Sequence, residues 1–324
     1  MEEERSLEGD AELEEELSDE ASETEDNLEF DPDYQSTDEE ESEDEPEITA
    51  DTEAAYQSKN KKILWSSITP PQRRGRLPAH RIIKMTPGPT RDEEQGQKKS
   101  DKLAPIRNIW DKWVERLPLL YNPGPNVTVD ECLVRFRGQC PFKQYMPSKP
   151  GKYGIKIWAA CDSRSSYAWN MQIYTGKAAD GKSEKNQGMR VVLDMTAGLE
   201  GHTVTCDNFF TSYALGEELL RRKMTMIGTV RSNKPELPPA LLSMKNRLRF
   251  SSKFAFTDTH ALVSYCPRKN KNVLLMSTLH RDDQVSDKDH KKPEIILDYN
   301  HTKGGVDNLD KTESFCNSRK DQET

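Results

Sequence analysis

Residues 126–156 read NVTVDECLVRFRGQCPFKQYMPSKPGKYGIK, and this stretch decides the fold. Two runs rich in β-branched and aromatic residues flank a basic turn, which is typical of two neighbouring β-strands. Asp130 lies in the middle of the first run, beside Glu131. Because a charged side chain within an apolar strand is costly unless it has a partner, Asp130 is a candidate functional residue.

Two further aspartates stand in similar settings. Asp207 ends the apolar part of HTVTCDNFF (202–210), and Asp307 follows a double glycine in TKGGVDNLD (302–310), at the head of a helix-like segment. From residue 126 onward we expect three strands, a helix, a strand, a helix, a strand, a β-rich insertion and a helix. This order predicts an α/β fold with a mixed sheet flanked by helices, in which the three aspartates meet at one edge.

Three clustered aspartates favour a divalent-metal site. Mg²⁺ prefers carboxylate, water and phosphate oxygens, and two such ions, or Mn²⁺ in their place, activate the attacking oxygen and steady the leaving oxygen of a phosphoryl transfer. Asp310 lies one helical turn after Asp307, where it is a candidate fourth ligand or a partner of one.

Each acid also has a plain structural alternative. Asp130 would pair with Arg135 or Arg137, Asp207 would cap the helix that follows it, and Asp307 would be an ordinary charge at a helix N-terminus. The spacing of the residues alone leaves both interpretations open.

Charge divides the chain into an acidic leader and a basic body. Residues 1–54 contain 27 acidic residues and one arginine, whereas residues 55–324 have a formal net charge of +17. We therefore expect a disordered acidic tail over 1–54. The basic body suits a polyanion, so DNA is the expected partner; a solvated lysine-rich surface is the alternative.

The remaining chain is predicted to comprise four parts. These are a basic, proline-rich linker (55–100), the first part of the sheet domain (101–231), an inserted β-rich subdomain (232–298) and a closing helix (299–324). The linker contains Arg73-Arg74-Gly75-Arg76, which is typical both of a minor-groove contact and of a nuclear-import cluster, so we expect a nuclear protein.

Other classes of protein are disfavoured by what the sequence lacks. No segment approaches the roughly eighteen consecutive apolar residues that cross a bilayer, and the acidic start does not resemble a secretory leader. The cysteines form no C-x-x-C pair, which argues against a zinc module and for reduced thiols in the cytosol or nucleus. We expect neither a membrane nor a small-molecule substrate as partner.

Several blocks of sequence closely resemble the piggyBac-type transposases and the domesticated proteins derived from them. They are the FRG, PSKP and KYGIK elements of Val127–Lys156, DKLAPIR (101–107), TCDNFFTS (205–212), GTVRSNK (228–234) and YNHTKGGVDNL (299–309). The blocks occur in the family's order and cover essentially all of residues 101–320.

The resemblance implies a ribonuclease-H-like catalytic domain with an inserted β domain. It also implies a Mg²⁺ site at Asp130, Asp207 and Asp307, with Asp310 at a further acidic position, and cut-and-paste DNA movement. In that chemistry water nicks a strand, the freed 3′-hydroxyl forms a hairpin, and the ends are joined into TTAA targets. The basic side chains expected to contact phosphates near the metal are Arg135, Arg137, Lys143, Lys149, Lys152, Arg231 and Lys234.

Two departures from the family qualify this expectation. The family carries a helical dimerisation and DNA-binding region where this chain has only a short polar connector between PGPTR (87–91) and DKLAPIR. It also continues beyond SRK (318–320), often into a cysteine-rich tail. The chain therefore resembles a truncated copy with impaired transposition and doubtful homodimerisation. A catalytically inactive, domesticated protein that binds DNA or chromatin is the alternative.

Overall fold

The computed structural model describes residues 55–70, 101–147, 149, 151–176, 184–288 and 290–311. The expected acidic tail and the Arg73–Arg76 cluster lie outside these residues, as does the end of the expected closing helix. In the part that is described, no helix is both long enough and apolar enough to cross a membrane.

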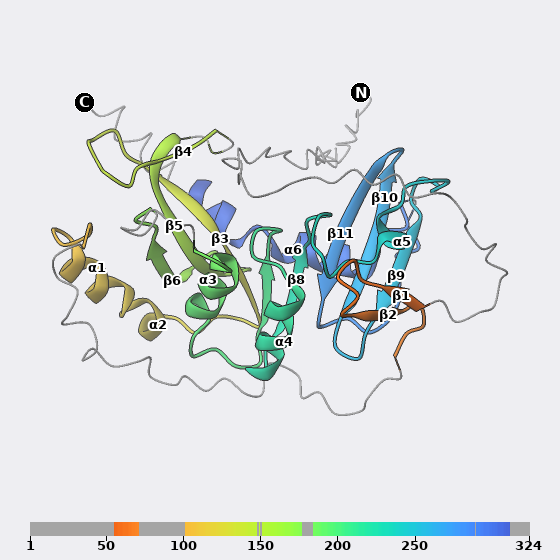
Figure 1. The fold of residues 1–324 in the computed structure, drawn as a ribbon. Coiled ribbons are helices and arrows are strands. Elements are labelled where there is room, and N and C mark those ends of the chain that lie inside the picture. Colours follow the sequence, from red (N-terminus) through yellow and green to blue (C-terminus); the bar gives the residue numbers. More distant parts are fainter. Residues whose placement is uncertain are drawn as a thin grey trace, which may run out of the picture. The chain divides into compact units, whose positions relative to one another are not determined.

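A mixed sheet runs through the described residues (Figure 1). Its strand order is β1-β2-β9-β10-β11-β8-β7-β3-β5-β4, with β6 paired to β5. The strands β3, β7 and β8 are parallel to one another and the other pairs are antiparallel, which confirms the predicted mixed sheet. The bounds are β1 (Ala55–Gln57), β2 (Leu64–Ser66), β3 (Asn126–Arg135), β4 (Gln144–Met146), β5 (Lys152–Asp162), β6 (Ala168–Ile173), β7 (Thr203–Cys206), β8 (Thr225–Thr229), β9 (Ser252–Phe256), β10 (Ala261–Arg268) and β11 (Lys271–Ser277).

Helices cover both faces of this sheet. They are α1 (Arg107–Val114), α2 (Leu117–Leu120), α3 (Gln187–Met195), α4 (Tyr213–Arg221), α5 (Pro239–Leu242) and α6 (Glu294–Thr302). In β8, Met226 packs in the same core cluster as the buried residues of α3 and α4, whereas the next residue, Ile227, packs with α6. Because neighbouring side chains of a strand point to opposite faces, α6 lies on the face opposite α3 and α4.

The expectation that residues 55–100 form a linker is wrong for their first part. There β1 and β2 form a hairpin, and Ser66 pairs with Phe256 of β9. Trp65 is 0% exposed, and its indole Nε1 donates a hydrogen bond to the carbonyl of Glu236 at 3.0 Å. One buried indole anchors three-residue strands that are too short to show an alternating pattern in the sequence.

The β-rich region 232–298 continues the sheet instead of standing apart from it. Its last strand, β11, pairs with β8 in antiparallel register. The expected boundary between this region and a closing helix at residue 299 falls inside α6, which begins after Pro293 and ends at Thr302. A turn at residues 303–304 separates α6 from a second helical segment, which is described over residues 305–311 and carries Asp307. We call it the Asp307 segment.

Candidate metal centre

A small cavity of about 60 Å³ lies where β7 ends beside the middle of β3. It is lined by Thr128, Val129, Asp130, Thr205, Cys206, Asp207, Tyr299, Lys303 and Asp307. All three aspartates predicted as metal ligands thus contribute to one cavity.

The sheet places the first two aspartates side by side. Parallel pairing aligns Val129 of β3 with Cys206 of β7, so Asp130 and Asp207 follow at equivalent positions. Asp207 also organises the turn after β7, because its Oδ1 accepts a hydrogen bond from the backbone N–H of Phe209 at 2.9 Å. Asp207 does not cap the helix that follows, because the N-cap of α4 is Ser212, whose hydroxyl accepts a hydrogen bond from the backbone N–H of Leu215 at 3.2 Å.

The third aspartate arrives on the Asp307 segment, which threonines and a glycine hold against the strands. The Thr128 hydroxyl donates to the carbonyl of Thr302 at 2.6 Å, and the hydroxyls of Thr205 and Thr302 lie 2.7 Å apart. A side chain at Gly305 would have no room, since an added Cβ would stand 2.7 Å from Thr128 Oγ1. This close approach requires glycine at the start of the segment.

Like charges strain the strand side of the site. Burial, followed by the charges of Glu131 and Asp207, raises the pKa of Asp130 well above its ordinary value. Burial and the charge of Glu131 raise the pKa of Asp207 to about 6. Both shifts mean that the ionised carboxylates lack sufficient positive charge around them.

On the helix side, a lysine supplies that positive charge. Lys149 Nζ lies 3.2 Å from Asp307 Oδ1 and 3.0 Å from Asp310 Oδ2. Burial alone would lower the pKa of Lys149, but the negative charges of Asp310, Asp130 and Asp307 outweigh it and raise that pKa above its usual value. Asp310 does not line the cavity; its Oδ1 accepts a hydrogen bond from the backbone N–H of Leu133 at 3.1 Å.

The donor set fits a hard divalent cation in its chemistry. Aspartate oxygens are the ligands that Mg²⁺ and Mn²⁺ take in proteins, and the raised carboxylate pKa values indicate a place where a cation is stabilising. Within the described ranges, however, no three metal-ligating side chains already stand at coordinating separation. Asp130, Asp207 and Asp307, which line one cavity, are the candidate ligands of such an ion.

The other predicted site residues lie outside the cavity lining. Arg231 Nε donates a hydrogen bond to Asn208 Oδ1 at 2.9 Å. The charge of Arg231 lowers the pKa of Asp207, but burial and the charge of Glu131 raise it by more. The remaining predicted phosphate contacts lie at the end of β3, around β4 and after β8. They are Arg135, Arg137, Lys143, Lys152 and Lys234. Lys234 is half-buried and the other four are exposed.

The sequence analysis missed three residues of the site. Glu131 carries the charge that most strongly opposes ionisation of Asp207, and it pairs with Lys156 at 3.6 Å. Tyr299 and Lys303 line the cavity from the end of α6, with the Lys303 ammonium 5.8 Å from the tyrosine ring centre. Their spacing of four residues, directly before the double glycine, was the available signal.

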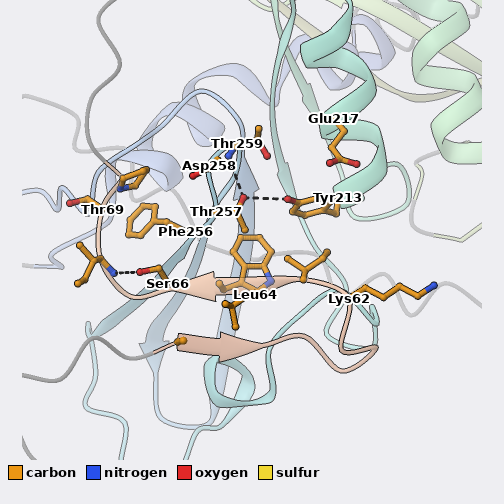
Figure 2. A pocket seen from close by; sticks show the side chains of 15 residues that line it. Lys62, Leu64, Ser66, Thr69, Tyr213, Glu217, Phe256, Thr257, Asp258 and Thr259 are labelled. Carbon is orange, nitrogen blue, oxygen red and sulfur yellow. Dashed lines mark hydrogen bonds between the residues drawn. The ribbon is translucent and has the colours of Figure 1, made fainter.

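A second, larger cavity of about 670 Å³ lies between the β1–β2 hairpin, α4 and the β9–β10 turn (Figure 2). Its walls include Tyr213, whose hydroxyl donates to Thr257 Oγ1 at 3.3 Å, and Phe256. None of the predicted site residues lines it. The carboxylate cavity is therefore the candidate site, although it is much the smaller.

Comparison with known families agrees with this geometry. A family model described as Transposase IS4 matches residues 89–323. The mixed sheet described above is thus the fold of a transposase domain. The chain belongs to this transposase family, and its relatives place it among the piggyBac-type members. Transposases of this DDE type generally use divalent metal ions.

Two human proteins are among its relatives. The chain is 27% identical over 230 residues to PiggyBac transposable element-derived protein 3, covering 65% of this chain and 38% of that protein. It has the same identity over the same length to the Chimeric ERCC6-PGBD3 protein, of which 21% is covered. The chain thus spans well under half the length of these curated relatives.

A solved structure supports the fold directly. The chain matches the piggyBac transposase in a cryo-EM structure of its synaptic complex with hairpin DNA, with 39% sequence identity and a TM-score of 0.62. The match covers 68% of this chain and 47% of that one. The mixed α/β fold predicted from the sequence is therefore that of a piggyBac transposase catalytic domain.

Proposed function

We propose that this domain cuts and joins DNA strands in a reaction that depends on Mg²⁺, with two ions, or Mn²⁺ in their place, held by Asp130, Asp207 and Asp307. One observation carries the proposal: three aspartates from β3, from the end of β7 and from the Asp307 segment line one cavity. TTAA targets are part of the same proposal, by the resemblance of the chain to the family.

The residues of the site have separate roles in this proposal. A bound divalent cation supplies a lowered pKa for the attacking water or 3′-hydroxyl and a positive charge at the leaving oxygen. Asp130 and Asp207 provide oxygens from the rigid sheet, whereas Asp307 provides one from the Asp307 segment. Arg231, which is hydrogen-bonded to Asn208 beside Asp207, is the proposed phosphate contact at this site.

DNA is the proposed partner, and the nucleus is the proposed location. Residues 55–324 carry a formal net charge of +17, and exposed basic side chains gather around β4, among them Arg137, Lys143 and Lys152. The matched piggyBac transposase is described in a complex with hairpin DNA. Homodimerisation, which the sequence analysis doubts for this chain, stays a proposal.

Titration calorimetry of the full chain with Mn²⁺ tests the metal centre. We expect micromolar-to-millimolar binding that Asp130→Ala/Asp207→Ala abolishes. An exposed acid that does not line the cavity, Asp194 on α3, provides the control, and Asp194→Ala should bind Mn²⁺ as the wild type does. Equal heats for the wild type and the double variant would remove the proposal.

The second candidate is a protein that binds DNA or chromatin without cutting it. It is favoured by the finding that no group of three metal-ligating side chains is already assembled in the described residues. Both candidates require DNA binding that weakens steeply with salt, since lysine and arginine displace counterions from phosphates. Binding without strand cleavage in Mg²⁺ or Mn²⁺, on DNA with TTAA sites, would select the second candidate.

A further inference from the structure

The connection between β4 and β5 carries a lysine into the metal centre. The backbone N–H of Lys149 donates to the carbonyl of Met146 at 3.1 Å, and the carbonyl of Lys149 accepts from the N–H of Lys152 at 3.0 Å. These bonds form a tight turn. From it the Lys149 ammonium reaches both Asp307 and Asp310, at 3.2 Å and 3.0 Å.

The two aspartates bound by this ammonium differ in their surroundings. The Asp310 side chain is 13% exposed, and its second oxygen accepts a hydrogen bond from the backbone of Leu133 in β3. The Asp307 side chain is 55% exposed and faces the cavity. Asp310 is therefore the fixed partner of Lys149, and Asp307 is the partner that is easier to release.

The oxygen of Asp307 that holds Lys149 belongs to a proposed metal ligand. An ammonium group and a divalent cation repel each other, so close contact of both with one carboxylate weakens the binding of each. An ammonium at this oxygen supplies in advance part of the neutralisation that a metal ion would provide. The Lys149 side chain is only 16% exposed, so solvent screens the repulsion between its ammonium and a bound metal ion weakly.

We propose that Lys149 is an internal counter-cation, which holds Asp307 until a divalent cation displaces it and which stays bound to Asp310. The inference rests on the proposed function, because it requires a metal ion at Asp307. In this proposal Lys149 is a positioning residue, because metal binding at Asp307 changes the stability of the turn between β4 and β5. Once it releases Asp307, the ammonium becomes available to an anionic group at the edge of the cavity, such as a phosphate.

Mn²⁺ calorimetry of the full chain tests the competition. Lys149→Met removes the charge and keeps an unbranched side chain, so we expect Mn²⁺ to bind about tenfold more tightly than in the wild type. Lys149→Arg keeps the charge and should stay within about threefold of the wild type. Lys112→Met, on the exposed side of α1, controls for a change of net charge and should leave the affinity unchanged. Equal or weaker binding by Lys149→Met overturns the inference.

Amide hydrogen exchange provides a readout that does not depend on activity. With Mg²⁺ bound, we expect faster exchange at the N–H of Lys152, which bonds to the Lys149 carbonyl, because release of Asp307 loosens the turn. In Lys149→Met the exchange should be fast with or without Mg²⁺. Exchange in the wild type that is independent of Mg²⁺ contradicts the coupling.

The failures of the two proposals are distinguishable. Equal Mn²⁺ heats for the wild type and Asp130→Ala/Asp207→Ala overturn the proposed function, whatever Lys149 does. Loss of heat in that double variant, together with unchanged affinity in Lys149→Met, overturns only the role of Lys149.

Discussion

The two halves of the carboxylate site differ in how their negative charge is balanced. On the strand side, Asp130 and Asp207 stand with Glu131 at the edge of a rigid sheet, and their pKa values are raised. On the helix side, Asp307 and Asp310 share the ammonium of Lys149. The strand side is thus prepared for a cation from solution, while the helix side already holds one that belongs to the chain.

The carboxylates of the two halves are also positioned in different ways. The strand acids are brought together by parallel pairing of β3 with β7, and each carboxylate accepts one local backbone hydrogen bond, Asp130 from Glu131 and Asp207 from Phe209. The helix acids depend on three local features: hydroxyl bonds from Thr128 and Thr205, the close approach at Gly305, and the lysine. Mutations should therefore separate the two halves.

The largest effect on stability is expected at Gly305. Gly305→Ala places a Cβ 2.7 Å from Thr128 Oγ1, and overpacking of this kind costs about 1–3 kcal/mol. The adjacent Gly304 is the matched control, because its added Cβ would meet Asn308 at an ordinary 3.6 Å. Urea denaturation should show a lower free energy of unfolding for Gly305→Ala and a change within about 0.5 kcal/mol for Gly304→Ala.

The Mn²⁺ affinity of the same two glycine variants is a second measurement. Displacement of the Asp307 segment should weaken Mn²⁺ binding in Gly305→Ala and leave the pairing of β3 with β7 intact. If both glycine variants unfold alike, the close approach at Gly305 does not position the helix side.

A smaller effect, of opposite sign, is expected at Asp207. Its folded-state pKa of about 6 lies above the value of about 3.9 in an unfolded chain, so between these values the folded protein keeps a proton that the unfolded chain has lost. The free energy of unfolding of the metal-free protein therefore falls as pH rises through this window. Asp207→Asn removes the penalty and should stabilise the metal-free protein by about 1 kcal/mol at pH 7, after allowance for solvent screening.

Thermal denaturation at pH 4 and pH 7 in a chelator checks this prediction. At pH 4 the variant should match the wild type, because Asp207 is protonated in the folded protein. A variant less stable than the wild type at pH 7 would show that the bond of Asp207 to the N–H of Phe209, in the turn after β7, outweighs the cost of its buried charge.

The smallest effect is expected at Asp310. Asp310→Asn keeps an oxygen for the N–H of Leu133 but loses the charge that faces Lys149, so we expect destabilisation of about 0.5–1 kcal/mol. A double-mutant cycle with Lys149→Met isolates the pair. A coupling energy near zero would mean that Lys149 gains little from Asp310 and is held mainly by Asp307.

Much of the site was predictable because the relevant signals are local. The order of strands and helices around Asp130 and Asp207 follows from alternation and turns, and the double glycine before Asp307 marks the start of a helical segment. The β1–β2 hairpin escaped prediction because one buried tryptophan, Trp65, and pairing with β9, nearly two hundred residues away, hold it. Lys149 was expected to contact phosphate, since a sequence does not reveal which distant charge a lysine meets.

The sequence alone indicated the family through the resemblance of its motifs, and it predicted the mixed sheet through residue type and short-range periodicity. It also singled out the three aspartates that line one cavity. Only the tertiary structure decided that Lys149 occupies the helix side of the site, that Glu131 strains the strand side and that residues 55–66 extend the sheet. The physical reason is that electrostatic partners and edge-strand pairing are set by distance in space, and residues far apart in the chain create them.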